Sequence, residues 1–105
     1  MDVRLSKKAT LQINDSLSFV AKVSKEAANS LLQEIKSKLS NLSTFPYSGS
    51  SLTEQPVTGI DMRKLIVSDG RYGIIYAVLK EYVYVYYFVD FRMDNITTAA
   101  EFGKI

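Results

Sequence analysis

The C-terminal half of the chain decides its fold, since residues 62–91 read MRKLIVSDGRYGIIYAVLKEYVYVYYFVDF. Three runs in this stretch are rich in Val, Ile, Tyr and Phe, as β-strands are: residues 62–67, 72–79 and 82–91. Ser68-Asp69-Gly70 supplies turn residues between the first two runs, and two charged residues separate the second run from the third. Because connections this short join antiparallel neighbours, we expect three adjacent antiparallel strands.

The N-terminal half follows a helical period instead. Apolar residues recur every three or four positions from Ala9 to Val20 and again from Ala28 to Leu42, which gives each segment one apolar stripe. Ser6 and Ser24 are suitable N-caps, and Pro46 ends any helix. The pattern predicts helices over residues 7–22 and 24–42, with a short strand over residues 2–5 before them.

These elements predict an α+β fold, with an N-terminal strand and a two-helix hairpin packed on one face of a small antiparallel sheet. The length of 105 residues is typical of a single domain, which we expect to span residues 1–105. A serine- and threonine-rich loop is expected over residues 47–61, and a short or frayed helix over residues 97–105.

Composition excludes several kinds of chemistry. The chain has no cysteine and no histidine, so disulfides, thiolate nucleophiles, imidazole catalysis and Cys/His zinc sites are ruled out. The net charge of +2 is low for a protein that binds nucleic acid nonspecifically. Residues 1–8 do not form a signal peptide and no apolar run is long enough to span a bilayer, so we expect a cytoplasmic protein without a membrane partner.

Four segments carry a family resemblance. Phe45-Pro46 with Gly49 follows the second predicted helix, and residues 62–67 read MRKLIV. Residues 72–76 form a Tyr-x-x-x-Tyr strand, and residues 89–94 read VDFRMD. In this order, over roughly residues 3 to 96, the chain resembles the RelE/ParE superfamily of toxins from bacterial type II toxin–antitoxin systems. The resemblance implies a growth-inhibiting protein, neutralised by a cognate antitoxin that wraps a segment over it. Operator DNA is an implied partner only through the antitoxin.

The resemblance implies two different targets and does not choose between them. RelE-like members cut mRNA on the ribosome, whereas ParE-like members poison DNA gyrase. A third alternative is a degenerate, inactive toxin. No cofactor or metal is implied. Apolar and aromatic residues on the sheet face away from the helices are what an antitoxin can bury.

For the nuclease alternative, the resemblance implies four catalytic cations: Arg92, Arg71, Lys64 and Arg63. Arg92 matches the arginine that closes the last strand in RelE-like toxins, and Arg63 and Lys64 match a basic pair on an earlier strand. Successive strand residues face opposite ways, so at most one of that pair shares a site with Arg92. Gly73 stands where RelE-like toxins have an arginine, and Arg71 is the candidate to replace it.

The set of acid–base residues is incomplete, because neither His nor Tyr follows Arg92. This weakens the nuclease alternative relative to the other two. The candidate residues also have structural explanations. Arg92 can pair with Asp90 or Asp94, and tyrosines on a sheet beneath a helical hairpin more often belong to the core.

Overall fold

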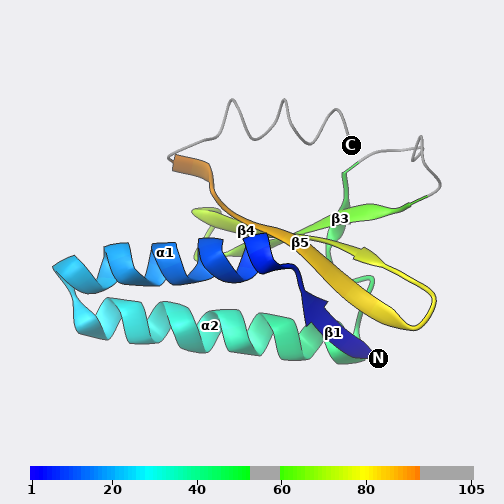
Figure 1. Cartoon of the computed structure of the whole chain (residues 1–105), viewed down its shortest axis with the longest axis horizontal. Helices are drawn as coiled ribbons and strands as arrows, with labels where there is room; N and C mark the ends of the chain where they lie inside the picture. The colour runs from blue at the N-terminus through cyan, green and yellow to red at the C-terminus, as the bar shows by residue number, and fades with distance from the viewer. Residues whose placement is uncertain (53–59, 93–105) are drawn as a thin grey trace.

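The structure, a computed structural model, describes residues 1–52 and 60–92. Two helices lie side by side against one face of a five-stranded sheet (Figure 1). In chain order the elements are β1 (Asp2–Leu5), α1 (Lys7–Val23), α2 (Lys25–Thr44), β2 (Ser50–Ser51), β3 (Met62–Val67), β4 (Tyr72–Val78) and β5 (Tyr82–Asp90). The predicted α+β fold is confirmed. The predicted helix over residues 97–105 and part of the loop over residues 47–61 lie outside the described residues.

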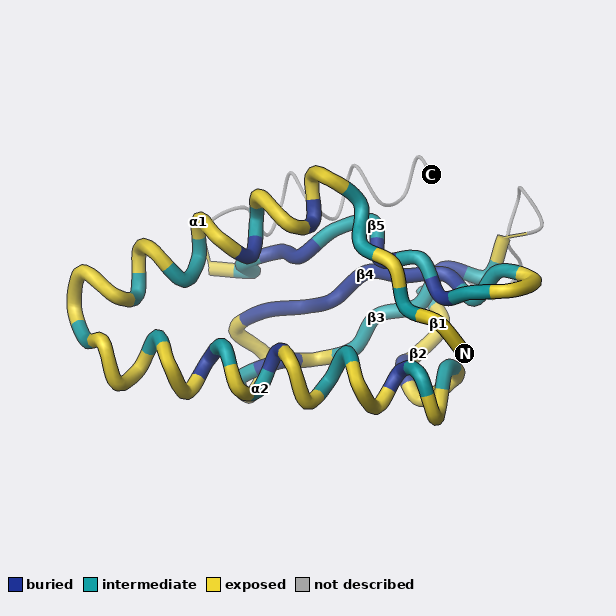
Figure 2. The backbone as a smooth tube through the Cα atoms, turned by 60° about the horizontal axis from the view of Figure 1, so that its bottom comes forward, coloured by how far each residue is buried: buried dark blue, intermediate teal, exposed yellow. Residues whose placement is uncertain are grey.

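Both helices begin where the sequence predicts. The hydroxyl of Ser6 accepts a hydrogen bond from the Ala9 amide at 2.9 Å, and that of Ser24 accepts one from the Ala27 amide at 3.1 Å. These bonds satisfy amides that a helix N-terminus otherwise leaves without an acceptor. The end of the hairpin around the α1–α2 junction projects past the sheet in both views (Figures 1 and 2), and Val23 there is 85% exposed.

The strand order is β1-β5-β4-β3-β2. The predicted antiparallel pairing of β3 with β4 and of β4 with β5 is confirmed. The sheet as a whole is mixed, however, because β1 pairs with β5 in parallel. No tight turn fixes the direction of β1, since both helices, β3 and β4 come between it and β5 in the chain. The two-residue strand β2, which pairs with Arg63 and Lys64, carries no sequence pattern and was not predicted.

A bulge interrupts the alternation of side chains along β5. Ile75 pairs with Tyr87 whereas Tyr76 pairs with Val85, so Tyr86 is an extra residue on β5. Val83 and Val85 therefore belong to the helix-side core together with Phe88, although regular alternation would place Phe88 on the opposite face. The bulge thus reverses the faces of the residues that follow Tyr86 relative to those of a regular strand.

Side chains are buried on both faces of the sheet. The helix-side core contains residues from both helices and from β3, β4 and β5, including Leu42, Tyr72 and Tyr76. A second cluster on the other face contains Met62, Ile75, Ala77 and Val89, all buried. Strand β4 is accordingly buried along almost its whole length (Figure 2). The sequence suggested an open apolar surface on this face, to which an antitoxin could bind. These four side chains are instead buried within the chain.

Candidate functional site

Arg63, near the start of β3, is held in place by Asp61 and by the segment of residues 47–49. Its Nη2 lies 2.8 Å from Oδ2 of Asp61, and its Nη1 donates hydrogen bonds to the carbonyl oxygens of Gly49 at 2.7 Å and Tyr47 at 3.3 Å. The guanidinium also lies 5.0 Å from the centroid of the Tyr47 ring. Only 19% of the Arg63 side chain is exposed. Arg63 thus fastens the segment after α2 to the sheet.

Tyr76 completes this network from β4. Its side chain is fully buried, and its hydroxyl oxygen accepts a hydrogen bond from the Gly49 amide at 2.8 Å. Burial raises the pKa of the Tyr76 hydroxyl above its ordinary value of 10.0, and the Gly49 amide and Arg63 only partly offset the rise. At neutral pH the hydroxyl is therefore a neutral structural group.

Position 49 requires glycine because the Tyr76 side chain and the Lys64 backbone approach it closely. A Cβ at this position would lie 2.6 Å from the Tyr76 hydroxyl and 2.7 Å from the Lys64 carbonyl oxygen. Any side chain would push β3 and β4 away from the loop. Packing thus explains Gly49, one of the residues that carry the family resemblance.

Lys64 points to the other face of the sheet. Its Nζ lies 5.7 Å from the centroid of the Phe91 ring, and Phe91 packs against the second cluster with Ile75, the cross-strand neighbour of Lys64. Arg63, by contrast, is paired with Tyr76 of the helix-side core. The two residues lie on opposite faces, as the alternation of a strand requires.

Arg71 and Arg92 lie together at the end of the sheet where β5 finishes. The Phe91 amide donates a 2.9 Å hydrogen bond to the Arg71 carbonyl, which brings the two arginine backbones close. Arg92 pairs with Asp90, with Nε 3.5 Å from Oδ1, and its guanidinium lies 6.0 Å from the centroid of the Tyr72 ring. Its side chain is 47% exposed. The predicted pairing of Arg92 with Asp90 is confirmed.

Packing explains why Gly73 departs from the RelE-like pattern. A Cβ at Gly73 would lie 2.7 Å from Cζ and 2.8 Å from Cε2 of Phe91. The Phe91 ring therefore occupies the space into which a longer residue would extend. An arginine at this position requires Phe91 to move.

The structure brings two of the four predicted cations together and separates the others. Arg71 and Arg92 adjoin Tyr72, whereas Arg63 is paired with Tyr76, four residues further along β4. The side chain of Lys64 lies on the opposite face of the sheet from that of Arg63. Sequence reasoning missed Asp61, the partner of Arg63, although an acidic residue two positions before an arginine on a strand is a usable signal. Among residues 1–52 and 60–92, no group of three or more Asp and Glu side chains is placed to hold a metal ion.

Comparisons with known proteins agree with this fold. The family model for the ParE toxin of the type II toxin–antitoxin system parDE matches residues 3–94. The chain belongs to the ParE toxin family. It is therefore a toxin of a type II toxin–antitoxin system, and its partner is an antitoxin.

A solved structure entitled "Chromosomal ParDE TA system from P. aeruginosa" is similar, with a TM-score of 0.67 over 86% of this chain and 95% of the other. The sequences are only 15% identical, so this likeness concerns the fold. No curated protein sequence gives a significant match. None of the helices that the structure describes is long and apolar enough to cross a membrane.

Proposed function

We propose that this toxin acts in the cytoplasm by binding DNA gyrase and inhibiting it, without cutting RNA. Gyrase is the target that the resemblance to ParE-like toxins implies, and the match of the ParE family model supports this choice over the ribosome. A protein that acts by binding needs a complementary surface. It needs no acid, base or nucleophile of its own.

The observation that carries the proposal is the dispersal of the four candidate cations. Cleavage of a phosphodiester requires cations that converge on one phosphate, to stabilise the charge that grows in the transition state. The guanidinium of Arg63 instead donates hydrogen bonds to Asp61, Gly49 and Tyr47, and the side chain of Lys64 lies on the other face of the sheet. Arg63 is therefore occupied within the chain, and Lys64 extends toward Phe91 whereas the Arg92 guanidinium lies toward Tyr72.

Arg71 and Arg92 support the second candidate function, ribosome-dependent mRNA cleavage. Their backbones adjoin at one end of the sheet, both residues are exposed, and a guanidinium can bind a phosphate with two hydrogen bonds. The chain has no His and no Tyr after Arg92 to accept the proton of the ribose hydroxyl, and the neighbouring carboxylate of Asp90 is paired with Arg92 itself. A nuclease would have to obtain this group from the ribosome.

The two candidates are distinguished by inducing the toxin in bacteria and examining RNA and DNA from the same culture. We expect plasmid supercoiling to change while primer extension finds the mRNA intact. Arg92→Ala and Arg71→Ala should then be tested beside Lys80→Ala, an exposed cation at the opposite hairpin. Cleavage of mRNA at codon boundaries that is lost in Arg92→Ala, and retained in Lys80→Ala, would establish the nuclease instead.

A further inference from the structure

Four tyrosines of β5 form a continuous row on the face of the sheet away from the helices. All four are partly exposed: Tyr82, Tyr84, Tyr86 and Tyr87. Val83 and Val85 belong to the helix-side core, so the alternating residues Tyr82 and Tyr84 point to the other face. The bulge keeps the row unbroken, because Tyr86 and Tyr87 both pack against the second cluster.

Neighbouring rings of this tyrosine row contact one another. The ring centroids are 6.3 Å apart for Tyr82 and Tyr84, 4.7 Å for Tyr84 and Tyr86, and 6.4 Å for Tyr86 and Tyr87. The first two pairs meet edge to face, at interplanar angles of 79° and 83°. Because each ring restricts the next, the row has little side-chain freedom left to lose when a partner binds.

Basic side chains border the row on the side of β1 and α1. The guanidinium of Arg4, on β1, lies 4.2 Å from the centroid of the Tyr82 ring, and its Nε lies 3.0 Å from Oδ2 of Asp2. The Nζ of Lys8, in the first turn of α1, lies 5.2 Å from the centroid of the Tyr87 ring. No described carboxylate forms an ion pair with Lys8, which leaves a positive charge beside the row.

The row also carries hydroxyl groups that can donate to a partner. Within residues 1–52 and 60–92, the hydroxyls of Tyr82, Tyr84 and Tyr86 form no hydrogen bond with another residue. Burial raises the pKa of the Tyr86 hydroxyl above its ordinary value of 10.0, and the neighbouring tyrosines of the row raise it further. The Tyr86 hydroxyl is therefore a neutral donor at physiological pH, suited to a carboxylate acceptor.

The geometry of the rings favours a protein partner over a nucleic acid. Successive bases stack on the faces of aromatic rings, whereas neighbouring rings of this row are turned by 79°, 83° and 39° from one another. Cations already lie over Tyr82 and Tyr87. The net charge of +2 is also low for binding nucleic acid. Tyrosine and arginine, by contrast, are enriched among the residues that dominate protein–protein binding.

We propose that the tyrosine row, with Arg4 and Lys8, is the surface through which this toxin binds DNA gyrase, and that it receives an acidic patch of that enzyme. The rings pack against the patch, the hydroxyls donate hydrogen bonds to its carboxylates, and Lys8 forms an ion pair with one of them. A second copy of this chain fits less well, because row against row would bring like charges together. The inference rests on the proposed function and names the surface used for the same target.

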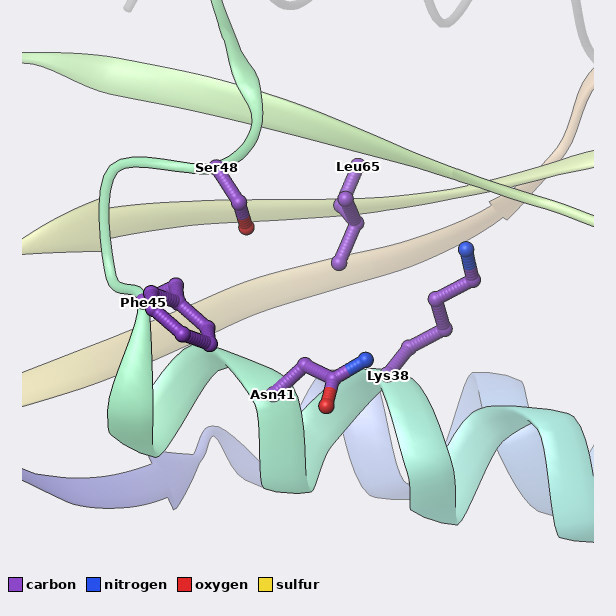
Figure 3. Close-up of a pocket in the computed structure, with 5 residues that line it drawn as sticks. All are labelled: Lys38, Asn41, Phe45, Ser48 and Leu65. Carbon is purple, nitrogen blue, oxygen red and sulfur yellow. The ribbon is translucent and has the colours of Figure 1, made fainter.

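The helix side of the sheet provides a control surface. A pocket of about 280 Å³ lies there between α2 and β3, lined by Lys38, Asn41, Phe45, Ser48 and Leu65 (Figure 3). Lys38 extends from the helix toward the strand (Figure 3), and no residue of the pocket belongs to the row. Reversing the charge of Lys38 therefore leaves the row unchanged.

The test uses purified gyrase and measures its affinity for the toxin and the toxin concentration that halves supercoiling. Lys8→Glu reverses a bordering charge, with exposed Lys22→Glu near the other end of α1 and Lys38→Glu as controls. Lys8→Glu places an acid in the first turn of a helix, where the helix dipole favours it, so the fold should not be weakened. Tyr84→Ala removes the middle of the row, and exposed Phe19→Ala on α1 is its control.

We expect Lys8→Glu and Tyr84→Ala each to raise the Kd for gyrase and the inhibitory concentration about tenfold or more. The three controls should stay within about twofold of the unmodified chain. The melting temperature of Lys8→Glu should not fall, and its affinity for the antitoxin should be unchanged, which separates a lost gyrase contact from a lost fold. If Tyr84→Ala fails to fold, Lys8→Glu decides.

Unchanged inhibition by the folded variants would overturn this inference and leave gyrase as the target. Loss of inhibition in Lys38→Glu alone would overturn it too, because gyrase would then contact the helix side. Loss of antitoxin affinity, of self-association or of binding to a labelled single-stranded oligonucleotide, with gyrase inhibition retained, would assign the row to a different occupant. Failure of the unmodified toxin to inhibit gyrase is a distinct result, which refutes the proposed function and this inference together.

Discussion

Arg63 and Arg92 lie near opposite ends of the β3–β4 hairpin and differ in exposure and in the number of their partners. At one end Arg63 is 19% exposed and makes bonds to Asp61, Gly49 and Tyr47. At the other end Arg92 is 47% exposed, and its side chain has a long contact to Asp90 at 3.5 Å and lies over the Tyr72 ring at 6.0 Å. Arg63 therefore stabilises the fold, whereas the side chain of Arg92 is half exposed to solvent.

This difference shows that the residue type alone does not identify a binding cation. Both arginines match the family pattern in the sequence, and both lie on or beside the sheet. What separates them is the number of acceptors already within hydrogen-bond distance. A guanidinium whose donors are satisfied within the chain costs free energy to redirect, because buried acceptors are then left unpaired.

The largest expected effect is at the crowded end, in Gly49→Ala. The new methyl group would meet the Tyr76 hydroxyl and the Lys64 carbonyl at under 3.0 Å, so we expect stability to fall by about 3 kcal/mol. Gly70→Ala is the comparison, since nothing lies near its Cβ and only its φ of 95° is unfavourable, which costs about 1 kcal/mol. Denaturant unfolding measures both, and equal losses would contradict the crowding at Gly49.

The next effect compares the two arginines directly. Arg63→Gln should reduce the free energy of unfolding by about 2 kcal/mol, because Asp61 and the Gly49 carbonyl lose a charged donor. Arg92→Gln should reduce it by less than about 1 kcal/mol, as for other exposed ion pairs. The comparison breaks down if the two variants unfold at the same denaturant concentration.

A smaller effect is expected for Tyr76→Phe, about 1 kcal/mol, because the buried Gly49 amide loses its acceptor. The variant should also change the pH dependence of stability. The pKa of Tyr76 is raised in the folded chain, so above about pH 10 the unfolded chain releases this proton more readily and stability falls with pH. Tyr76→Phe should show a shallower alkaline loss, and an identical slope in both chains would exclude burial of this hydroxyl.

Much of the fold follows from the sequence, because local signals agree with one another. The helix caps at Ser6 and Ser24, the stripes on both helices and the three β-rich runs all predict the elements that the structure contains. The parallel pairing of β1 could not be predicted, since a four-residue strand carries no information about a partner 80 residues further along the chain.

The bulge at Tyr86 could not be predicted from the sequence either. It depends on the register of β5 with β4, and the apolar run that contains it still has the pattern of a regular strand. The candidate site was less predictable than the fold for the same reason. The sequence marks cations but does not show that Arg63 is surrounded by backbone acceptors contributed from residues 47–49. Nor does it show that the ring of Phe91 fills the space above Gly73.

The proposed mode of action is tested most directly with purified components. Relaxed plasmid is incubated with DNA gyrase and increasing toxin, with and without the antitoxin, while a parallel ribosomal translation reaction reports on mRNA. We predict that supercoiling stops, that antitoxin restores it, and that the mRNA stays intact. Unimpaired supercoiling together with mRNA cleaved on the ribosome would contradict the account.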